Sequence, residues 1–427
     1  MARETVLHTL KEEEERVILV GVDRQEDSQQ AEACLDELEE LVKTAGAVAV
    51  GRMLQKREKP HPGLYLGTGK VEELKQMISL LEATGVVCDD ELSPAQLRNL
   101  ERELDTKVMD RTMVILDIFA ARAASSEGKI QVELAQLQYR LTRLTGMGAS
   151  MSRLGGGIGT RGPGEKKLEV DRRYIKDRIA ELKKDLAEVK THRSLLRQQR
   201  KKKGQPVVAL VGYTNAGKST ILNGLTKAGV LEEDKLFATL DTTTRTVTLP
   251  EGHEIFLTDT VGFIQKLSHH LVDAFKATLE ELRYADLLLH VVDSSNPNRQ
   301  THMDVVYRTL EELGCGQTPV ITVFNKVDRD VEYPLPNDQT ARSTIAISAK
   351  REEDLAALLA KIEEVIKSFR QTMTILLPYC EGGKLAQIYG RTTVLEEEHR
   401  EDGILLTITV DEELENRFKN YMIDDIF

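Results

Sequence analysis

The sequence predicts an α/β protein whose central part is a P-loop domain with a mostly parallel sheet. Three observations indicate this fold class: a glycine-rich loop after a short apolar run, two long segments with heptad spacing, and terminal regions that mix strand-like and helix-like stretches. We therefore expect an N-terminal α/β domain (1–122), a long antiparallel helical hairpin (123–204), the P-loop domain (205–370) and a small C-terminal α/β domain (371–427).

Length and composition exclude several classes of protein. The 427 residues suffice for several domains, and the formal net charge of -12 argues against a protein that coats nucleic acid indiscriminately. No apolar run approaches the ~20 residues that cross a bilayer, and a charged run from Lys11 to Arg16 replaces the apolar stretch of a signal peptide. The scattered cysteines form no CxxC pair, so we expect a protein of the reducing cytoplasm.

The N-terminal region alternates strand-like and helix-like stretches and the C-terminal region combines strands with one helix, so each is predicted to be a small α/β domain. Ser93 is a suitable N-cap for a helix with Pro94 at its first position. The Gly67-Thr68-Gly69-Lys70 segment lacks the third glycine of a dinucleotide fingerprint and is interpreted as a tight turn. The predicted N-terminal strands are Arg16–Val22, Ala47–Leu54 and Gly85–Cys88, and the helices are Ser28–Thr44, Val71–Leu81 and Pro94–Leu104. The predicted C-terminal strands are Thr372–Leu377, Thr392–Leu395 and Gly403–Val410, followed by a helix at Asp411–Tyr421.

Two long helices with one apolar seam each follow the N-terminal region, and we expect them to pair as an antiparallel hairpin. Seam residues recur with separations of 4, 3, 4 and 3, at Ile130, Leu134, Leu137, Leu141 and Leu144 and again at Ile175, Ile179, Leu182, Leu186 and Val189.

The connection between these helices, residues 145–164, is rich in glycine. A loop of this length is usually functional or disordered, so a binding loop and a flexible connector are both open. Glycine allows close approach of the backbone to a surface, and arginine suits phosphates. The second helix ends in a basic stretch without acidic residues. The candidate RNA contacts are Arg153, Gly155, Gly156, Gly157, Arg161, Gly162, Arg193, Arg197, Arg200, Lys201, Lys202 and Lys203.

The segment Gly212-Tyr213-Thr214-Asn215-Ala216-Gly217-Lys218-Ser219 has the pattern of a phosphate-binding loop. It follows the branched apolar run Val207–Val211, which is typical of a strand buried on both faces, and it precedes a helix. Backbone N–H groups and the helix N-terminus would bind the phosphates. Lys218 would reach the β- and γ-phosphates, and the Ser219 hydroxyl would bind Mg²⁺.

A DxxG motif, Asp259-Thr260-Val261-Gly262, follows the predicted strand Glu254–Thr258. Asp259 would hold a Mg²⁺-bound water, and the Gly262 N–H would sense the γ-phosphate.

Two further motifs favour guanine. An NKxD motif, Asn325-Lys326-Val327-Asp328, follows the predicted strand Val320–Phe324, and Ser348-Ala349-Lys350 follows Thr344–Ile347 as the last guanine-binding loop. The Asp328 carboxylate would accept both N–H groups of the guanine edge. Adenine lacks that pair of donors and would leave the carboxylate unpaired, so GTP is preferred over ATP.

The first switch should lie between the phosphate-binding loop and the DxxG motif, at Phe237-Ala238-Thr239-Leu240-Asp241. Several threonines there could supply the magnesium ligand that closes over the γ-phosphate. A neighbouring group could instead form a β-rich run into Val247, and the residues alone leave the choice open. This group is Thr242, Thr243, Thr244 and Thr246.

Two residues suggest an unusual mechanism. Phe263 follows DxxG, where Ras-like enzymes place the Gln that orients the attacking water, so intrinsic turnover should be slow. The Asn215 amide oxygen could bind a monovalent cation beside the phosphates, which would make K⁺ a second cofactor beside Mg²⁺. Alternatively, Asn215 only stabilises the turn of the loop.

These residues together resemble one family, the HflX GTPases, over most of the chain. The nucleotide motifs GYTNAGKS, FATLD and DTVGF are similar to that family's. Outside them, the resemblance rests on Leu92-Ser93-Pro94-Ala95-Gln96, Asp110 to Ala120, Gln131-Val132-Glu133-Leu134-Ala135-Gln136-Leu137 and the loop Gly155 to Glu165.

The resemblance implies a cytoplasmic GTPase that hydrolyses GTP to GDP and phosphate, binds the large (50S) ribosomal subunit, and splits or rescues ribosomes under stress. It implies that Thr239 is the magnesium threonine and that the hairpin carries its loop toward the peptidyl-transferase region. The catalytic residues would be Lys218, Thr239 and Gly262, and the metal contacts Ser219, Thr239 and, through water, Asp259. We expect a monomer.

Two alternative functions fit parts of the sequence. A GTP-dependent regulatory module could act on a protease or membrane partner, although no lipid-binding helix or anchor supports peripheral membrane association. An RNA-remodelling NTPase would use the basic helix end, but Asp328 argues against ATP in the P-loop domain.

Overall fold

The computed structural model describes residues 14–24, 28–151, 163–202, 205–226, 237, 243–266, 280–329, 334–369, 371–391, 393–410 and 417–423. The chain divides into two compact units. The first comprises Met1–Lys183 and Gln265–Ala274, and the second comprises Lys184–Ile264 and Phe275–Phe427. A short segment that follows the DxxG motif therefore belongs to the N-terminal unit.

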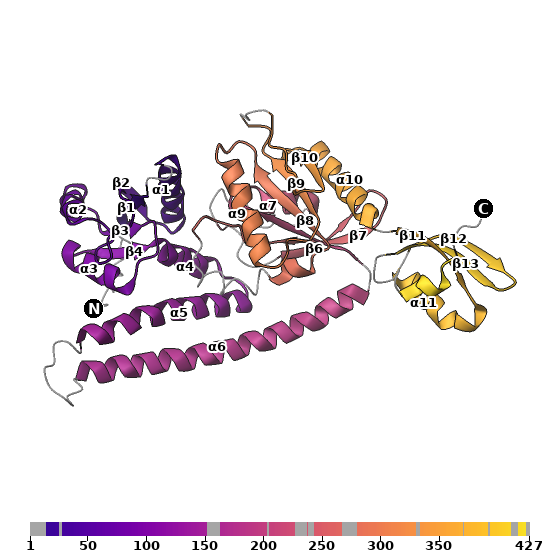
Figure 1. The fold of residues 1–427 in the computed structure, drawn as a ribbon, viewed down its shortest axis with the longest axis horizontal. Coiled ribbons are helices and arrows are strands. Elements are labelled where there is room, and N and C mark those ends of the chain that lie inside the picture. The colour runs from indigo at the N-terminus through magenta and orange to yellow at the C-terminus, as the bar shows by residue number, and fades with distance from the viewer. Residues whose placement is uncertain are drawn as a thin grey trace, which may run out of the picture. The chain divides into compact units, whose positions relative to one another are not determined.

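The first unit contains a four-stranded parallel sheet with the order β2-β1-β3-β4 (Figure 1). Helices α1 and α4 pack together, as do α2 and α3, so two pairs of helices accompany the sheet. Its strands are β1 (Arg16–Asp23), β2 (Val48–Lys56), β3 (Gly85–Cys88) and β4 (Lys107–Asp110). Its helices are α1 (Ser28–Thr44), α2 (Thr68–Leu81), α3 (Pro94–Leu104) and α4 (Arg111–Arg122).

One local expectation in this unit is wrong. The segment Gly67 to Lys70 is not a separate tight turn, because helix α2 begins at Thr68 with Gly67 as its N-cap. Glycine is acceptable at an N-cap, and the helix therefore starts one turn earlier than its apolar pattern indicates. In α3 the predicted cap is confirmed, since Ser93 and Gln96 form a capping box and Pro94 opens the helix.

The helical hairpin consists of α5 (Ser126–Met151) and α6 (Pro163–Lys202), which run antiparallel side by side (Figure 1). Leu134 and Leu182 of the predicted seams are buried. Across the pair, the Arg178 guanidinium donates to both oxygens of Glu133 at 2.8 and 3.0 Å. The predicted antiparallel hairpin is thus confirmed.

The P-loop domain is built on a six-stranded sheet with the order β10-β9-β8-β5-β7-β6. Only β6 runs antiparallel, to β7. The strands are β5 (Val207–Gly212), β6 (Thr243–Thr248), β7 (Glu254–Asp259), β8 (Leu287–Asp293), β9 (Val320–Asn325) and β10 (Ser343–Ala346). The helices are α7 (Lys218–Thr226), α9 (Arg299–Glu312) and α10 (Glu352–Phe369), with a 3₁₀ turn at Glu280–Tyr284. The central strands β5, β8 and β9 are almost entirely buried, which explains their continuous apolar runs.

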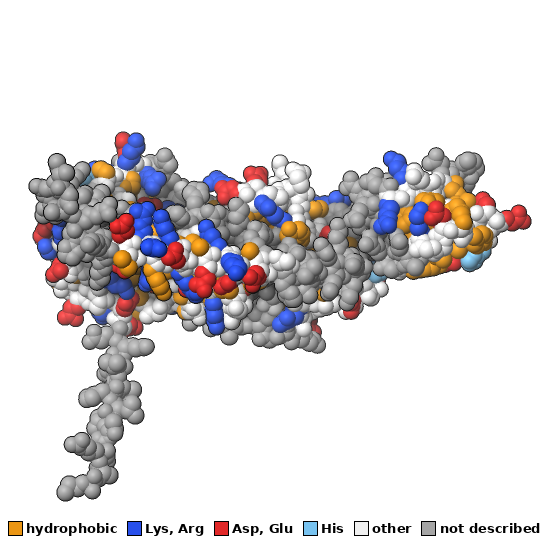
Figure 2. Space-filling model, turned by 90° about the horizontal axis from the view of Figure 1, so that it is seen from below, with side chains coloured by type: hydrophobic (Ala, Val, Ile, Leu, Met, Phe, Trp, Pro, Cys, Tyr) orange, Lys and Arg blue, Asp and Glu red, His pale blue; other side chains and the backbone are white. Residues whose placement is uncertain are grey.

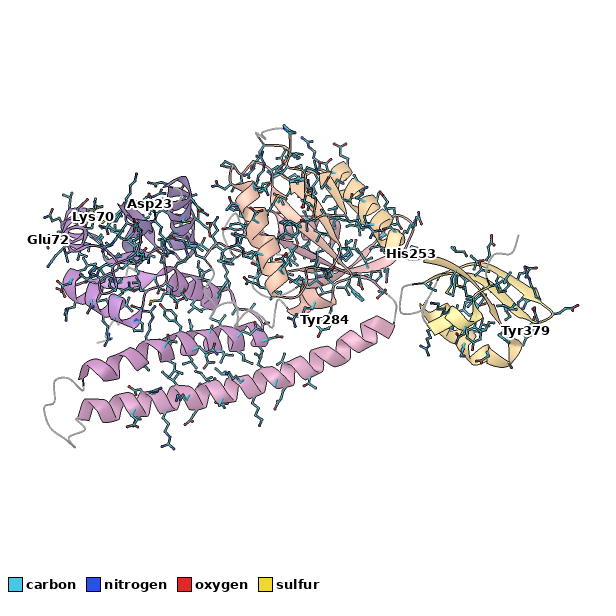
Figure 3. The ribbon with its side chains drawn as sticks, in the orientation of Figure 1. Asp23, Lys70, Glu72, His253, Tyr284 and Tyr379 are labelled. Atoms are coloured by element: carbon cyan, nitrogen blue, oxygen red, sulfur yellow. The ribbon has the colours of Figure 1, made fainter. Side chains whose placement is uncertain are left out.

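The C-terminal region forms an antiparallel sheet with the order β11-β13-β12. Figure 3 marks this region with Tyr379 and the N-terminal sheet region with Asp23. Its elements are β11 (Gln371–Leu377), a 3₁₀ turn (Tyr379–Glu381), α11 (Gly382–Arg391), β12 (Thr393–Arg400), β13 (Gly403–Val410) and a 3₁₀ turn (Lys419–Tyr421). Helix α11 lies outside the sequence expectations, and β12 extends to Arg400 instead of ending at Leu395. Most of the predicted helix Asp411–Tyr421 lies outside the described residues.

The described surface mixes charges of both signs. On the face shown in Figure 2, basic and acidic side chains lie next to one another, interrupted by apolar ones. None of the helices in the described ranges is long and apolar enough to cross a membrane. The architecture confirms the predicted fold class, with a mostly parallel P-loop sheet, an N-terminal α/β region, a helical hairpin and a small C-terminal α/β region.

Candidate functional site

The phosphate-binding loop connects β5 to α7 at the carboxyl end of a buried strand, where parallel sheets place their ligand sites. Three residues of the loop have a positive φ, Gly212 with 150°, Asn215 with 58° and Gly217 with 98°. A Cβ on Gly217 would overlap the side-chain amide of Asn325, so only glycine fits there. Asparagine tolerates the left-handed region better than most residues, and the exposed side chain of Asn215 is available to a ligand.

Lys218 is the cation of this loop. Its Nζ donates to the carbonyl oxygens of Gly212 at 3.1 Å and Tyr213 at 2.7 Å, and the residue is 6% exposed. Burial lowers the pKa of Lys218 to about 8, although the nearby Asp259 charge opposes the shift. The Thr214 hydroxyl is also buried and has no hydrogen-bond partner among the described residues. The loop therefore offers an ammonium group and an unpaired hydroxyl to an anion.

Two of the predicted magnesium residues, Ser219 and Asp259, meet at the start of α7. The Ser219 hydroxyl donates to Asp259 Oδ2 at 2.8 Å, and Asp259 is fully buried at the end of β7. A hydroxyl and a carboxylate are hard oxygen donors that suit Mg²⁺. No group of three or more His, Cys, Asp or Glu occurs in the described ranges that could hold a metal by itself. This small protein donor set fits Mg²⁺, which usually keeps waters and phosphate oxygens as its other ligands.

The DxxG segment closes against the phosphate-binding loop. The Phe263 N–H donates to the Gly212 carbonyl at 3.1 Å, and the Thr214 N–H donates to the Phe263 carbonyl at 2.8 Å. A Cβ on Gly262 would lie 2.9 Å from Thr214 Cα and 3.0 Å from Lys218 Nζ, so the close approach requires glycine. The Phe263 side chain is buried and carries no polar group that could orient a water.

The NKxD motif connects two other loops of the site. Asn325 Nδ2 donates to the Ala216 carbonyl at 2.9 Å, and Asn325 Oδ1 accepts from the Ala349 N–H at 3.0 Å. Lys326 Nζ donates to the Asn215 carbonyl at 2.7 Å. These bonds hold the phosphate-binding loop, the NKxD motif and the Ser348–Lys350 loop in one arrangement.

Asp328 presents the carboxylate predicted to bind guanine. The Ser348 hydroxyl donates to Asp328 Oδ1 at 2.7 Å, and Lys350 lies 4.0 Å from Oδ2. The hydrogen bond from Ser348 holds the pKa of Asp328 below its ordinary 3.8. Because its side chain remains 26% exposed, the ionised carboxylate can accept hydrogen bonds from a base.

Asp293 is a site residue that the sequence motifs missed. Its Oδ2 lies 2.7 Å from Lys326 Nζ, and its Oδ1 accepts from the Ser295 N–H and hydroxyl at 3.0 and 2.6 Å. Asp293 ends the buried strand β8, which pairs with β5. A polar residue at the carboxyl end of the strand beside the phosphate-binding strand is the signal that could have identified it.

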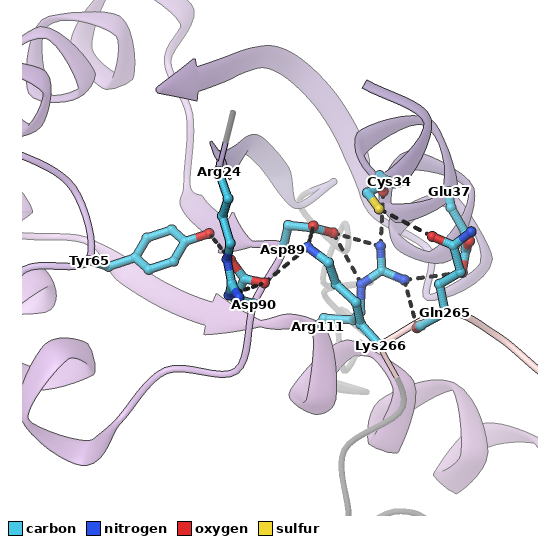
Figure 4. Close-up of polar contacts among 9 residues, drawn as sticks. All are labelled: Arg24, Cys34, Glu37, Tyr65, Asp89, Asp90, Arg111, Gln265 and Lys266. Atoms are coloured by element: carbon cyan, nitrogen blue, oxygen red, sulfur yellow. Dashed lines mark hydrogen bonds and ion pairs between the residues drawn. The ribbon is translucent and has the colours of Figure 1, made fainter. Parts of the chain in front are cut away.

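A second polar cluster lies in the first unit and includes two residues that follow the DxxG motif (Figure 4). Lys266 Nζ forms ion pairs with Asp89 and with Asp90, the latter at 2.9 Å. Gln265 Oε1 lies 3.3 Å from Cys34 Sγ. Asp89 and Asp90 follow β3, which pairs with β1 where the strand order 2-1-3-4 reverses direction. In doubly wound sheets, ligands bind beside such a reversal of strand order. Here Lys266 of the same chain binds to the two carboxylates at this position.

The structure also gives the contacts or positions of the other predicted site residues that it describes. Thr260 donates through its hydroxyl to the Leu210 carbonyl at 2.7 Å, and the Val327 N–H donates to the Ile347 carbonyl at 3.3 Å. Val261 and Phe237 are buried. Thr243, Thr244 and Thr246 lie on β6, as the β-rich alternative expected. Arg193, Arg197, Arg200, Lys201 and Lys202 lie on α6. Outside the described residues are Ala238, Thr239, Leu240, Asp241, Thr242, Arg153, Gly155, Gly156, Gly157, Arg161, Gly162 and Lys203.

Three family models match consecutive parts of the chain. Residues 32–120 match the GTP-binding GTPase N-terminal family, residues 122–200 match the GTP-binding GTPase middle region, and residues 207–326 match the 50S ribosome-binding GTPase family. The three matches therefore follow the N-terminal sheet, the hairpin and the P-loop domain.

Relatives of known name extend over nearly the whole chain. A GTPase HflX of Lacrimispora saccharolytica is 59% identical, over 96% of this chain and 97% of the relative. A GTPase HflX of Caldanaerobacter subterraneus subsp. tengcongensis is 49% identical, over 98% and 96%. The GTPase HflX of Escherichia coli is 42% identical, over 86% and 87%. This chain belongs to the HflX family of GTPases.

Proposed function

We propose that this GTPase binds the large (50S) ribosomal subunit when it holds GTP, and that it splits or rescues stalled or idle ribosomes under stress. It acts as a cytoplasmic monomer, and hydrolysis to GDP releases it from the subunit. The description of the family matched by residues 207–326 as ribosome-binding supports this proposal.

One structural observation carries the coupling of nucleotide to ribosome binding. Phe263 pairs with the phosphate-binding loop, whereas Gln265 and Lys266, two and three residues later, belong to the unit that contains α5 and the first half of α6. A movement of the DxxG segment on binding the γ-phosphate would therefore pull on the Asp89 and Asp90 carboxylates. Such a movement would convert the nucleotide state into a change in the unit that contains α5 and the first half of α6.

Each residue of the nucleotide site has its own role in GTP hydrolysis. Lys218 binds the β- and γ-phosphates, and the Gly262 N–H reports on the γ-phosphate. Ser219 and Thr239, with Asp259 through a water, would hold Mg²⁺, which neutralises phosphate charge when bound. The Phe263 side chain has no polar group that could orient the attacking water, so the intrinsic rate is low and the ribosome supplies the stimulation.

The proposed ribosomal contacts belong to two stretches of the sequence, the glycine-rich connection before α6 and the basic end of α6. Arg153 and Arg161 of the glycine-rich loop bind rRNA phosphates, and the surrounding glycines let the backbone approach closely. The basic end of α6, from Arg193 to Lys203, provides a second phosphate contact.

We also propose that K⁺ stimulates hydrolysis through the Asn215 amide oxygen. The exposed side chain and left-handed backbone of Asn215 support this role, although the same backbone suits a residue that only shapes the loop. GTPase rates in matched KCl and NaCl test it, and equal rates would refute it.

Sedimentation with purified 50S subunits tests subunit binding. We expect the protein to pellet with subunits in a non-hydrolysable GTP analogue and to stay in solution with GDP. Arg153→Ala with Arg161→Ala should weaken pelleting and leave nucleotide affinity intact. The matched control is Arg172→Ala with Arg173→Ala, two exposed arginines on the same hairpin. Equal pelleting of both double variants would refute the role of the loop.

Light scattering of intact ribosomes tests the splitting step separately. The protein with the GTP analogue should lower the scattering as ribosomes dissociate, and the GDP form should not. If it binds 50S subunits but leaves the scattering of intact ribosomes unchanged, the splitting activity is refuted while subunit binding stands.

A further inference from the structure

A cavity of about 330 Å³ lies in the first unit, between β4 and helices α3, α4 and α5. This volume is in the range of small-molecule sites, which begin at about 300 Å³. Its apolar wall consists of Leu97, Val108, Met113, Leu116 and Leu144. The P-loop belongs to the other unit, so the cavity is separate from the nucleotide site.

Arg143 in the cavity wall has donors that the described protein does not use. Its Nη2 donates to Asp110 Oδ2 at 2.5 Å, to the Leu92 carbonyl at 3.3 Å and to the Tyr139 hydroxyl. Its Nε and Nη1 are buried and have no partner among the described residues. Buried N–H groups of native proteins are nearly always paired, and unpaired donors of a charged group are especially unfavourable. An acceptor inside the cavity would remove this defect.

The charges around the cavity determine what kind of acceptor fits. Asp110, which is fully buried, already neutralises Arg143. The other acidic carboxyl and basic side chains of the lining are Glu101, Asp117 and Arg140, which together carry one net negative charge when ionised. An anionic ligand would therefore be repelled, and a cationic ligand could not accept hydrogen bonds from Arg143. An uncharged acceptor remains.

We propose that this cavity binds a small, uncharged, largely apolar molecule whose carbonyl or ether oxygen accepts hydrogen bonds from Arg143. The ligand would strengthen the joint between the N-terminal sheet and the hairpin. Asp110 ends β4, caps α4 by accepting from the Met113 N–H at 3.0 Å, and accepts from the Tyr139 hydroxyl of α5 at 2.8 Å. A molecule bound to Arg143 extends this network and fills the space between α3, α4 and α5.

Three naphthalene derivatives test the proposal on the full chain, because two fused rings suit a cavity larger than the ~150 Å³ that holds benzene. The probes are 2-acetylnaphthalene, which carries a ketone, 2-ethylnaphthalene, which has no hydrogen-bond acceptor, and 2-naphthoate, which carries a carboxylate. By equilibrium dialysis we expect the ketone to bind with a Kd on the order of 0.1 mM. The other two should bind about tenfold more weakly.

The ranking of the probes can overturn each part of the proposal. Equal affinity of ketone and hydrocarbon would refute hydrogen bonding by Arg143, and tighter binding of 2-naphthoate would refute the preference for an uncharged ligand. Absence of saturable binding for all three would refute the site itself.

Variants locate the binding within the molecule. Leu97→Trp and, separately, Gln136→Trp fill the cavity from α3 and from α5 and should abolish ketone binding. The control Leu80→Trp alters a residue that is 81% exposed on α2 and should bind like the parent. Hydrogen exchange of the β1 and β3 amides, which lie in the same unit as the cavity, shows that each variant is folded. Arg143→Met should remove the preference for the ketone over the hydrocarbon. Ketone binding that survives both filling variants would overturn the proposal.

Discussion

The Arg111 guanidinium and the Asp89 carboxylate form an almost fully buried ion pair, with Nη2 2.6 Å from Oδ1 and side chains 1% and 4% exposed. Lys266 pairs with the same carboxylate from the segment after DxxG. Burial alone would raise the pKa of Asp89, but the charges of Arg111 and Lys266 outweigh it and hold the pKa below 3.8. One carboxylate thus joins the end of β3, the start of α4 and the switch segment.

Replacing Arg111 should destabilise the first unit strongly. Arg111→Met leaves Asp89 buried with only Lys266, and breaking a buried pair costs about 3–5 kcal/mol. Hydrogen exchange of the β1 and β3 amides would measure this loss. The control Arg52→Met breaks exposed pairs with Asp36 and Glu39 and should cost about 1 kcal/mol or less. Equal losses in both variants would contradict the prediction.

The same pair predicts how stability depends on pH. The folded pKa of Asp89 is lowered, so its contribution is fully present above the unfolded value of about 3.9 and is lost as the pH falls through the folded value. The stability difference between the parent and Arg111→Met, measured by the same hydrogen exchange, should therefore shrink in acid. The loss begins at the pKa of Asp89 in the variant, which the loss of Arg111 raises, and ends at the lowered pKa in the parent. A difference that already shrinks near neutral pH would show that another group is responsible.

Removing the Lys266 charge should reduce the stimulation of GTP hydrolysis by the ribosome. Lys266→Met loses both ion pairs with Asp89 and Asp90 but keeps an aliphatic chain. We expect little change in intrinsic GTPase rate or GDP affinity and about a tenfold smaller stimulation by 50S subunits. The control Lys70→Met removes a surface pair with Glu73 and should be stimulated like the parent. If Lys266→Met retains full stimulation, the segment does not carry the coupling.

The nucleotide site was predictable because its chemistry demands particular residue types at particular strand ends. The phosphate-binding loop, Asp259 and Asp328 each follow a buried strand, and apolar runs reveal those strands. Asp293 was missed because an aspartate at a strand end has no motif of its own. The partners of Lys266 were missed because contacts across 176 residues of sequence leave no local pattern.

The parts of the fold that were missed have equally physical reasons. Strand β12 contains three consecutive glutamates, a residue that is depleted in strands, so the sequence did not indicate its full length. It is nevertheless an edge strand of the sheet, because it pairs with β13. Helix α11 begins with two glycines, and because glycine has a low helix propensity, the sequence does not indicate a helix there. Tertiary pairing in the first case and packing in the second outweighed local preference.

Gly262→Ala should impair the switch by steric contact. The new Cβ would lie 2.9 Å from Thr214 Cα and 3.0 Å from Lys218 Nζ, so the backbone pairing of Phe263 with the phosphate-binding loop must loosen. We expect a GTPase rate about tenfold lower, which corresponds to about 1.4 kcal/mol in the barrier. Gly69→Ala is the control, because nothing lies within 4 Å of its Cβ. A normal rate in Gly262→Ala would show that this close approach is dispensable.

Lys218 should make nucleotide affinity fall in mild alkali. Burial lowers its pKa to about 8, so above that pH the free protein must take up a proton before the ammonium can bind phosphate. GDP affinity should drop about tenfold between pH 7 and 9. Lys218→Met should bind GDP weakly with a flat profile. An equally steep profile in the variant would assign the titration to another group.

Lys218 should also make the stability of the nucleotide-free protein rise with pH, whereas it makes nucleotide affinity fall with pH. Between about 8 and 10.5 the unfolded chain binds more protons at Lys218 than the folded chain does. Without nucleotide, the free energy of unfolding of the second unit should therefore rise with pH over this window for the parent but not for Lys218→Met. Hydrogen exchange of the β5 amides would measure it, and identical pH dependence in both proteins would contradict the assignment.

Asp328→Asn should change base preference from guanine to xanthine. The Asp328 carboxylate, held ionised by the Ser348 hydroxyl, would accept from guanine N1–H and the 2-amino group. An amide offers one acceptor and one donor, which matches N1–H and the 2-carbonyl of xanthine. We expect GTP affinity to fall about 100-fold and the affinity for xanthosine triphosphate to rise. Asp304→Asn, on the exposed face of α9, is the control and should keep its preference for GTP. Competition binding with both nucleotides measures the change, and loss of both affinities would show that Asp328 only supports the loop.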